Sequence, residues 1–263
     1  MDGAGDGAWN MAADEAMLVE HAQERILPTL RFYAWKPAAV SLGYFQRTER
    51  EIDLNVCTNR GIDVIRRLTG GRAVLHDAEV TYSLVVKENE PYIPQGITAS
   101  YLFFSRGIAA GLARLGVPAC LQDPRPSMGA SRSPACFDAP SHYELTVGGR
   151  KLVGSAQLRR DGVLLQHGSI LLKFDPAALT GLFVLAEQEQ RDEVTAELSR
   201  RATSLAETTG KSFSFDEVAA AIAGGIAEQC GIFLNLSERT ASEYALIEAL
   251  QQKYRSLEWT LRR

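Results

Sequence analysis

The segment Tyr143–Leu172, YELTVGGRKLVGSAQLRRDGVLLQHGSILL, determines the fold class. Two turn dipeptides, Gly148-Gly149 and Asp161-Gly162, each separate two runs that are rich in Val, Leu and other strand-forming residues. Dipeptides of this kind adopt the mirror-image turns that join antiparallel strands. The segment therefore predicts two β-hairpins. Strand alternation then predicts that four side chains share one face: Lys151, Val153, Ser155 and Gln157.

Strand-like runs also precede this segment. They are rich in β-branched and aromatic residues and cover Thr29–Trp35, Ala38–Leu42, Asp63–Arg67 and Thr81–Val86. By contrast, the stretch Gln122–Ser141 contains four prolines and almost no apolar periodicity, which predicts a long surface loop.

Helical patterns flank the strands. Apolar residues recur at helical spacing in Asn10–Ala22, where Asn10 is the expected N-cap, and in Ile97–Leu115. Two capping boxes open further helices, Ser214 with Glu217 and Thr240 with Glu243. Antiparallel hairpins with segregated helices are typical of an α+β fold. We expect one domain over residues 1–263, with a flexible tip at 1–9, an active-site loop within 122–141 and C-terminal helices within 212–263.

The composition excludes several classes of protein. The 263 residues are 46% hydrophobic and 23% charged, values typical of a soluble globular protein. A net charge of −4 argues against nucleic-acid binding, and no apolar run reaches the ~18 residues that span a membrane. The four cysteines, Cys57, Cys120, Cys136 and Cys230, form no CxxC pair and no zinc spacing. We therefore expect a reduced, cytoplasmic protein without a bound metal.

The segment RRLTGGRAVLHD (Arg66–Asp77) is a candidate binding loop. Glycine lacks a Cβ, so a strand that runs into Thr69-Gly70-Gly71 lets the backbone approach a ligand closely. The forked donors of Arg66, Arg67 and Arg72 suit a carboxylate or a phosphate. A tight turn with solvated arginines is the simpler interpretation of a glycine pair, and the spacing differs from the Walker and Rossmann nucleotide-binding patterns.

Two further side chains could carry chemistry. A free cysteine is usually a small buried hydrophobe, which is our interpretation of Cys57, Cys120 and Cys230. Cys136 lies instead in the polar loop PACFDAP, where it could act as a nucleophile. Lys151 could be an exposed strand residue or a desolvated base that lines a cavity. Histidines in two glycine-containing segments, His76 and His167, could belong to the site or be structural.

These segments resemble a known family. Arg66–Ser83 and Gly149–Leu172 are similar to the two signature segments of the biotin/lipoyl protein ligase and lipoyltransferase catalytic domain. NMAADEAML (Asn10–Leu18) and RFYAWKPAAVSLGYFQ (Arg31–Gln46) also resemble it. Within the family, CFDAPSHYEL (Cys136–Leu145) resembles the Gram-positive type of octanoyltransferase that begins lipoate biosynthesis, although His142 stands where an aromatic residue is expected.

The resemblance implies a fold like that of class II synthetases and biotin protein ligases, with a mainly antiparallel central sheet, a smaller sheet and flanking helices. It implies that Cys136 accepts octanoyl from acyl carrier protein as a thioester. Lys151 would be the base or orienting group, and a lysine of a lipoyl domain, such as that of glycine-cleavage H protein, would be the acceptor. No ATP or metal is implied. The residues expected to bind substrate are Arg67, Thr69, Gly70, Gly71, Arg72, His76, Gly154, Ser155, Ala156 and His167.

Three other functions stay open at this point: an ATP-dependent lipoate–protein ligase, an octanoyl amidotransferase between lipoyl domains, and a non-catalytic module that binds carrier domains. We expect a monomer that binds neither nucleic acid nor membrane. Its carrier partners are acidic, so we expect a basic docking patch in the two signature segments, made of Arg66, Arg67, Arg72, Arg150, Lys151, Arg159 and Arg160.

Overall fold

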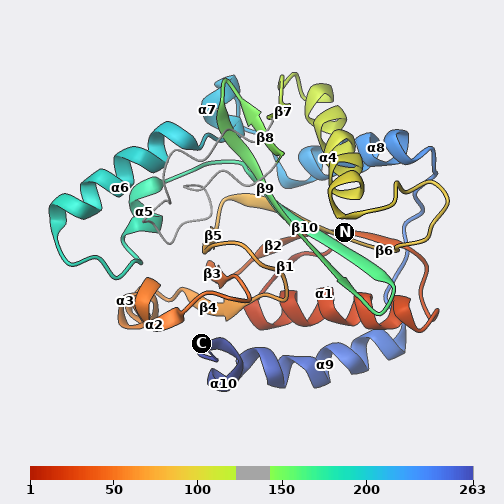
Figure 1. Ribbon diagram of the computed structural model, residues 1–263, viewed down its shortest axis with the longest axis horizontal. Coiled ribbons are helices and arrows are strands. Elements are labelled where there is room, and N and C mark those ends of the chain that lie inside the picture. The colour runs from red at the N-terminus through yellow and green to blue at the C-terminus, as the bar shows by residue number, and fades with distance from the viewer. Residues whose placement is uncertain (123–142, 263) are drawn as a thin grey trace.

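A seven-stranded sheet forms the centre of the computed structural model, which describes residues 1–122 and 143–262 (Figure 1). Its strand order is β1-β2-β6-β10-β9-β8-β7, and only the β1–β2 pair is parallel. The strands are β1 (Ala4–Gly5), β2 (Thr29–Trp35), β6 (Glu79–Lys87), β7 (Cys120–Gln122), β8 (Glu144–Val147), β9 (Arg150–Arg160) and β10 (Val163–Leu171).

A second sheet of three strands lies beside the first. Its order is β4-β3-β5, and its strands are β3 (Ala39–Leu42), β4 (Asp63–Arg66) and β5 (Val74–His76). An apolar cluster joins this sheet to α3 (Leu54–Asn59), α5 (Pro176–Thr180) and α6 (Gln188–Arg201). Two further short helices are α2 (Thr48–Glu51) and α7 (Leu205–Thr209). The α+β fold with a large, mainly antiparallel sheet and a smaller one is thus confirmed.

Two helix pairs cover the faces of the large sheet (Figure 1). On one face, which we call the outer face, Tyr82 of the sheet shares a core with Phe104 and Ile222 of α4 (Ile97–Arg114) and α8 (Phe215–Cys230). The opposite face, which we call the inner face, packs against α1 (Gly7–Ala22) and the small sheet. Helix α9 (Ala241–Arg255) runs alongside α1, and α10 (Leu257–Thr260) follows it.

The two predicted hairpins are confirmed, and they share one long strand. Strand β9 pairs with β8 through the Gly148-Gly149 turn and with β10 through the Asp161-Gly162 turn. All four turn residues have positive φ, between 55° and 77°. Two consecutive residues with positive φ define the type I′ turn, whose twist matches that of the strands it connects.

A bulge in β9 changes which side chains share a face. Leu145 of β8 lies opposite Val153, but the next residue, Thr146, lies opposite Lys151, so Leu152 is an extra residue on β9. Leu152 and Val153 both pack in the outer-face core. The prediction that Lys151 shares a face with Val153 is therefore wrong, because the alternation shifts at the bulge and brings Lys151 to the inner face.

Residues 1–9, for which the sequence predicts flexibility, include strand β1 and the first turn of α1. Strand β1 pairs with β2, and the Asp2 carboxylate is bonded to Arg31 and Arg239. Helix α1 begins at Gly7, and its N-cap is Asp6, whose side chain accepts from the backbone N–H of Trp9. The prediction that Asn10 caps this helix is wrong, because Asn10 is buried in the first turns and its amide donates to the carbonyl of Ala34.

The C-terminal helices follow the predicted signals. Both capping boxes are present, at Ser214 and at Thr240, where each side chain bonds to the backbone three residues later and the glutamate bonds back. No helix in the described part of the chain is both long and apolar enough to cross a membrane.

Candidate functional site

The Thr69–Arg72 loop is held against the small sheet by a buried arginine. The guanidinium of Arg67 donates to the carbonyls of Gly70 at 2.9 Å, Arg72 at 2.8 Å and Ser41 at 2.8 Å. Gly71 has a φ of +97°, and a Cβ on the neighbouring Gly43 would lie 1.9 Å from the Gly71 carbonyl oxygen. The glycines therefore permit a close backbone crossing, and Arg67 supports the loop through its carbonyls.

A chain of hydrogen bonds fixes this loop to the large sheet and to α1. Thr69 Oγ1 lies 2.6 Å from His167 Nε2, and His167 Nδ1 lies 3.2 Å from Asp14 Oδ2. The same carboxylate accepts from Arg31 at 2.7 Å and from Tyr33 at 3.0 Å. Burial alone would raise the pKa of Asp14, but the bonds from His167 and Arg31 outweigh it and leave that pKa below its usual value.

His76 occupies a second buried network between the two sheets. Its ring stacks on Trp35 with centroids 4.1 Å apart. Its Nδ1 lies 2.7 Å from Glu79 Oε1, and its Nε2 lies 2.7 Å from Ser41 Oγ. Ser169 donates to the same Glu79 oxygen at 2.9 Å. His76 Nδ1 therefore links β5 to β6 of the large sheet, and Nε2 links it to β3 of its own sheet.

Strand β9 supplies the next part of the inner face. In the antiparallel register Gly154 lies opposite Ser169, and Ala156 lies opposite His167, so these small residues lie on the same face as the two networks. Ser155 points the other way. Its hydroxyl accepts from Tyr82 at 2.8 Å on the outer face, which separates its side chain from the other expected substrate-binding residues.

Lys151 completes the arrangement. Its side chain is only 4% exposed, and its ammonium forms an ion pair with the Glu144 carboxylate of β8. Its carbonyl accepts from the backbone N–H of Thr203 at 2.9 Å, which joins β9 to the segment after α6. The chain leaves the described part at Gln122 and re-enters at Tyr143, and Gln122 lies opposite Glu144 in the sheet. Cys136 and the rest of the predicted loop lie outside the described residues, within the segment 123–142. The residues on either side of this segment, Gln122 and Tyr143, are close to the Lys151–Glu144 pair in the sheet.

The other cysteines differ from one another in accessibility. Cys57 and Cys230 are buried, and burial raises the pKa of each thiol to about 11, which leaves little thiolate at neutral pH. Cys120 is exposed, so the interpretation of this residue as a buried hydrophobe is wrong. It lies on β7, which is the last strand of the large sheet among the described residues.

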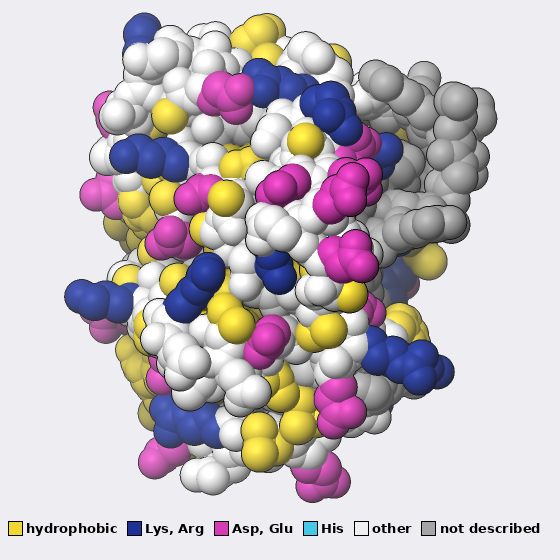
Figure 2. Space-filling view, turned by 90° about the vertical axis from the view of Figure 1, so that its left-hand side faces the viewer, with side chains coloured by type: hydrophobic (Ala, Val, Ile, Leu, Met, Phe, Trp, Pro, Cys, Tyr) yellow, Lys and Arg dark blue, Asp and Glu magenta, His cyan; other side chains and the backbone are white. Residues whose placement is uncertain are grey.

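The predicted basic patch in the signature segments is wrong. Arg66 is fully buried and donates to backbone carbonyls, including that of Gly43 at 2.7 Å. Most of the other cations are paired with carboxylates: Arg150 with Glu207, Lys151 with Glu144, Arg159 with Glu88, and Arg160 with Glu15. Figure 2 shows basic and acidic side chains interspersed over the face that carries α6 and α3. Most of the basic side chains in the two signature segments therefore form hydrogen bonds or ion pairs within the protein.

Three carboxylates of the site were not among the predicted site residues: Asp14, Glu79 and Glu144. The sequence did contain a signal for them, because each is an acidic residue inside an apolar helical or strand pattern. A carboxylate buried in this way needs a hydrogen-bonding or charged partner. Among the described residues, no group of three or more His, Cys, Asp or Glu is placed to hold a metal ion.

The two-sheet fold described above is that of a known catalytic domain. The model of the lipoyl protein ligase A/B catalytic domain matches residues 6–227, and the chain belongs to this family. It is similar to the octanoyltransferase LipM of Kyrpidia tusciae, with 45% identity over 99% of this chain and 97% of the relative. It is also similar to octanoyltransferase LipM of Moorella thermoacetica, with 43% identity over 99% and 96% of the two chains.

Solved structures support the same fold. A bipartite lipoate protein ligase from Thermoplasma acidophilum superposes with a TM-score of 0.80 and 26% identity, covering 99% of this chain and 94% of that one. A lipoate-protein ligase A bound with ATP gives a TM-score of 0.77 at 26% identity, with 99% of both chains covered.

Proposed function

We propose that this chain is an octanoyltransferase that carries the acyl group on Cys136. The observation that carries the proposal is the position of Lys151. This buried lysine and its partner Glu144 lie where the chain leaves and re-enters around the segment that contains Cys136. The full-length similarity to octanoyltransferases agrees with it.

The reaction consists of two acyl transfers. The Cys136 thiolate attacks the octanoyl thioester of acyl carrier protein, a new thioester forms on Cys136, and the carrier leaves as a thiol after it takes up a proton. The amine of a lipoyl-domain lysine then attacks this thioester, loses a proton as the amide forms, and returns Cys136 as a thiol. Exchange between thioesters is nearly isoenergetic and the amide is more stable, so neither ATP nor a metal is needed.

Lys151 and Glu144 supply proton transfer in this scheme. In each step the Lys151 ammonium first passes a proton to Glu144, and the resulting amine accepts the proton of the Cys136 thiol in the first step and that of the attacking amine in the second. On the inner face, β9 presents only the small residues Gly154 and Ala156 opposite Ser169 and His167, and we propose that the acyl chain lies along this part of the strand. The donor is acyl carrier protein, the acceptor is a lipoyl domain of the glycine-cleavage H protein type, and the enzyme works as a cytoplasmic monomer.

Intact-mass analysis tests the proposal. Mixed with octanoyl-acyl carrier protein and no ATP, the protein gains one octanoyl group that hydroxylamine removes. The Cys136→Ser variant gains no hydroxylamine-labile adduct, whereas Cys57→Ser, Cys120→Ser and Cys230→Ser still load. A requirement for ATP would instead favour a lipoate–protein ligase, which the similarity to the ATP-bound ligase makes the second candidate.

A further inference from the structure

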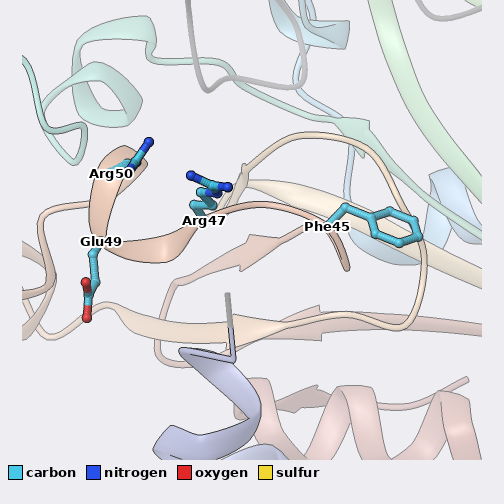
Figure 3. Close-up of a pocket in the computed structure, with 4 residues that line it drawn as sticks. All are labelled: Phe45, Arg47, Glu49 and Arg50. Carbon is cyan, nitrogen blue, oxygen red and sulfur yellow. The ribbon is translucent and has the colours of Figure 1, made fainter.

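The absence of the expected basic patch raises the question of how an anionic donor is recognised. Two exposed arginines on the segment next to the Thr69–Arg72 loop form no ion pair with a described residue. Arg47 and Arg50 are exposed, and neither guanidinium is paired with a carboxylate among the described residues. Both line a hollow of about 420 Å³ together with Phe45 and Glu49 (Figure 3). The two guanidinium groups point to the same side of this hollow, and the Glu49 carboxylate points away from them.

The hollow also presents an aromatic ring to solvent. Phe45 is 67% exposed, an unusual position for a phenyl ring, and it meets the ring of Tyr44 edge-on with centroids 5.0 Å apart. The guanidinium of Arg262 lies 4.2 Å from the Tyr44 ring centroid and adds a third positive charge beside the hollow.

The loop that carries these side chains is attached to the candidate site. The backbone N–H of Tyr44 donates to the Thr69 carbonyl at 2.9 Å, and Thr69 is the residue bonded to His167. Arg66 donates to the carbonyls of Gly43 at 2.7 Å, Tyr44 at 3.1 Å and Gln46 at 2.9 Å. A buried guanidinium that binds three carbonyl groups of residues 43–46 fixes the loop, so the hollow keeps a set position relative to the Thr69–Arg72 loop.

From this placement we infer that Arg47 and Arg50 bind the phosphate of the phosphopantetheine arm on which the donor carries its acyl group, and that Phe45 packs against that arm. The inference rests on the proposed function. Guanidinium groups recognise phosphate through forked, charge-assisted hydrogen bonds. When the phosphate of the phosphopantetheine arm is bound in the hollow, the rest of the arm extends past the Thr69–Arg72 loop and carries the thioester toward the candidate site. The acceptor lipoyl domain has no such phosphate, so the hollow distinguishes donor from acceptor.

Single-turnover loading and discharge measured separately test this inference. The Arg47→Gln/Arg50→Gln double variant is expected to lose tenfold or more in kcat/KM for octanoyl-acyl carrier protein, mostly through KM. Loading from octanoyl-pantetheine, which lacks the phosphate, and discharge to the lipoyl domain are expected to stay unchanged. Free 4′-phosphopantetheine is expected to inhibit loading of the unsubstituted enzyme and not of the variant.

The matched control is Arg106→Gln/Lys211→Gln, which removes two exposed cations outside the hollow and should leave all rates unchanged. Unchanged loading from the carrier protein in the Arg47/Arg50 variant, or an equal loss with octanoyl-pantetheine, would overturn the phosphate assignment. An equal loss in discharge would overturn it as well, because the hollow would then serve both partners. If the unsubstituted enzyme forms no octanoyl adduct, the proposed function itself fails, which is a separate result.

Discussion

Lys151 is the residue whose chemistry the mechanism depends on most. It is buried on the inner face and paired with Glu144, so a proton can pass between amine and carboxylate without bulk water. Replacement by arginine keeps the charge but removes an amine that can give up and take back a proton, because a guanidinium stays protonated. We expect Lys151→Arg to fold and to lose roughly 100-fold or more in both half-reactions, as loss of general acid–base catalysis does.

The measurement is single-turnover loading of Cys136 and discharge to the lipoyl domain across pH 6–10, with the exposed Lys173→Arg as the control. Near-wild-type rates for Lys151→Arg in both steps would show that the lysine acts by charge alone.

At the scale of elements, Asp14 joins α1 to the large sheet. Its carboxylate binds the Arg31 guanidinium of β2 and the His167 ring of β10, and both partners are buried. Removing one member of a buried ion pair leaves the other uncompensated, which costs about 3–5 kcal/mol. We expect Asp14→Asn to lower the free energy of unfolding by about that amount.

Urea unfolding at pH 7 measures this difference. The control is Asp192→Asn, because Asp192 is exposed on α6 and its carboxylate accepts a hydrogen bond from the side chain of Gln188. If the two variants are equally stable, the Asp14 network does not hold α1 on the sheet.

The elements also show which parts of the fold the sequence could predict. Turn dipeptides specify backbone φ locally, so Gly148-Gly149 and Asp161-Gly162 predicted both hairpins. The bulge at Leu152 depends on how β8 and β9 pair, and no local signal in KLVGS marks it. For the same reason Lys151 could be identified by resemblance but could not be assigned to the inner face of the sheet. The ion pairs of the arginines in the signature segments also depend on tertiary contacts, so the sequence alone did not predict them.

At the scale of the whole molecule, Asp2 links three distant segments. It is bonded to Arg31 of β2 and to Arg239 just before α9. Burial alone would raise the pKa of this carboxyl, but the bonds from Arg239 and Arg31 outweigh it and lower the pKa to about 2. A depressed pKa in the folded state stabilises the protein above the unfolded value of 3.8, and this stabilisation is lost as the pH falls toward 2.

The shift corresponds to roughly 2 kcal/mol. We therefore expect Asp2→Asn to be less stable than the unsubstituted protein by that amount at pH 6, with the difference shrinking between pH 4 and pH 2. Chemical unfolding of both proteins over this range measures it. A difference that does not change with pH would mean that the carboxyl does not titrate with folding.

Arg66 and Thr260 have a consequence for the order in which the protein matures. The fully buried Arg66 guanidinium donates at 2.8 Å to the carbonyl of Thr260, which lies 194 residues later in the chain. At a synthesis rate of about 5–20 residues per second, roughly 10–40 s separate the two residues on the ribosome. Throughout that interval Arg66 has its acceptors at Gly43, Tyr44 and Gln46 but not the Thr260 carbonyl, so its set of hydrogen bonds is completed only after translation has passed residue 260.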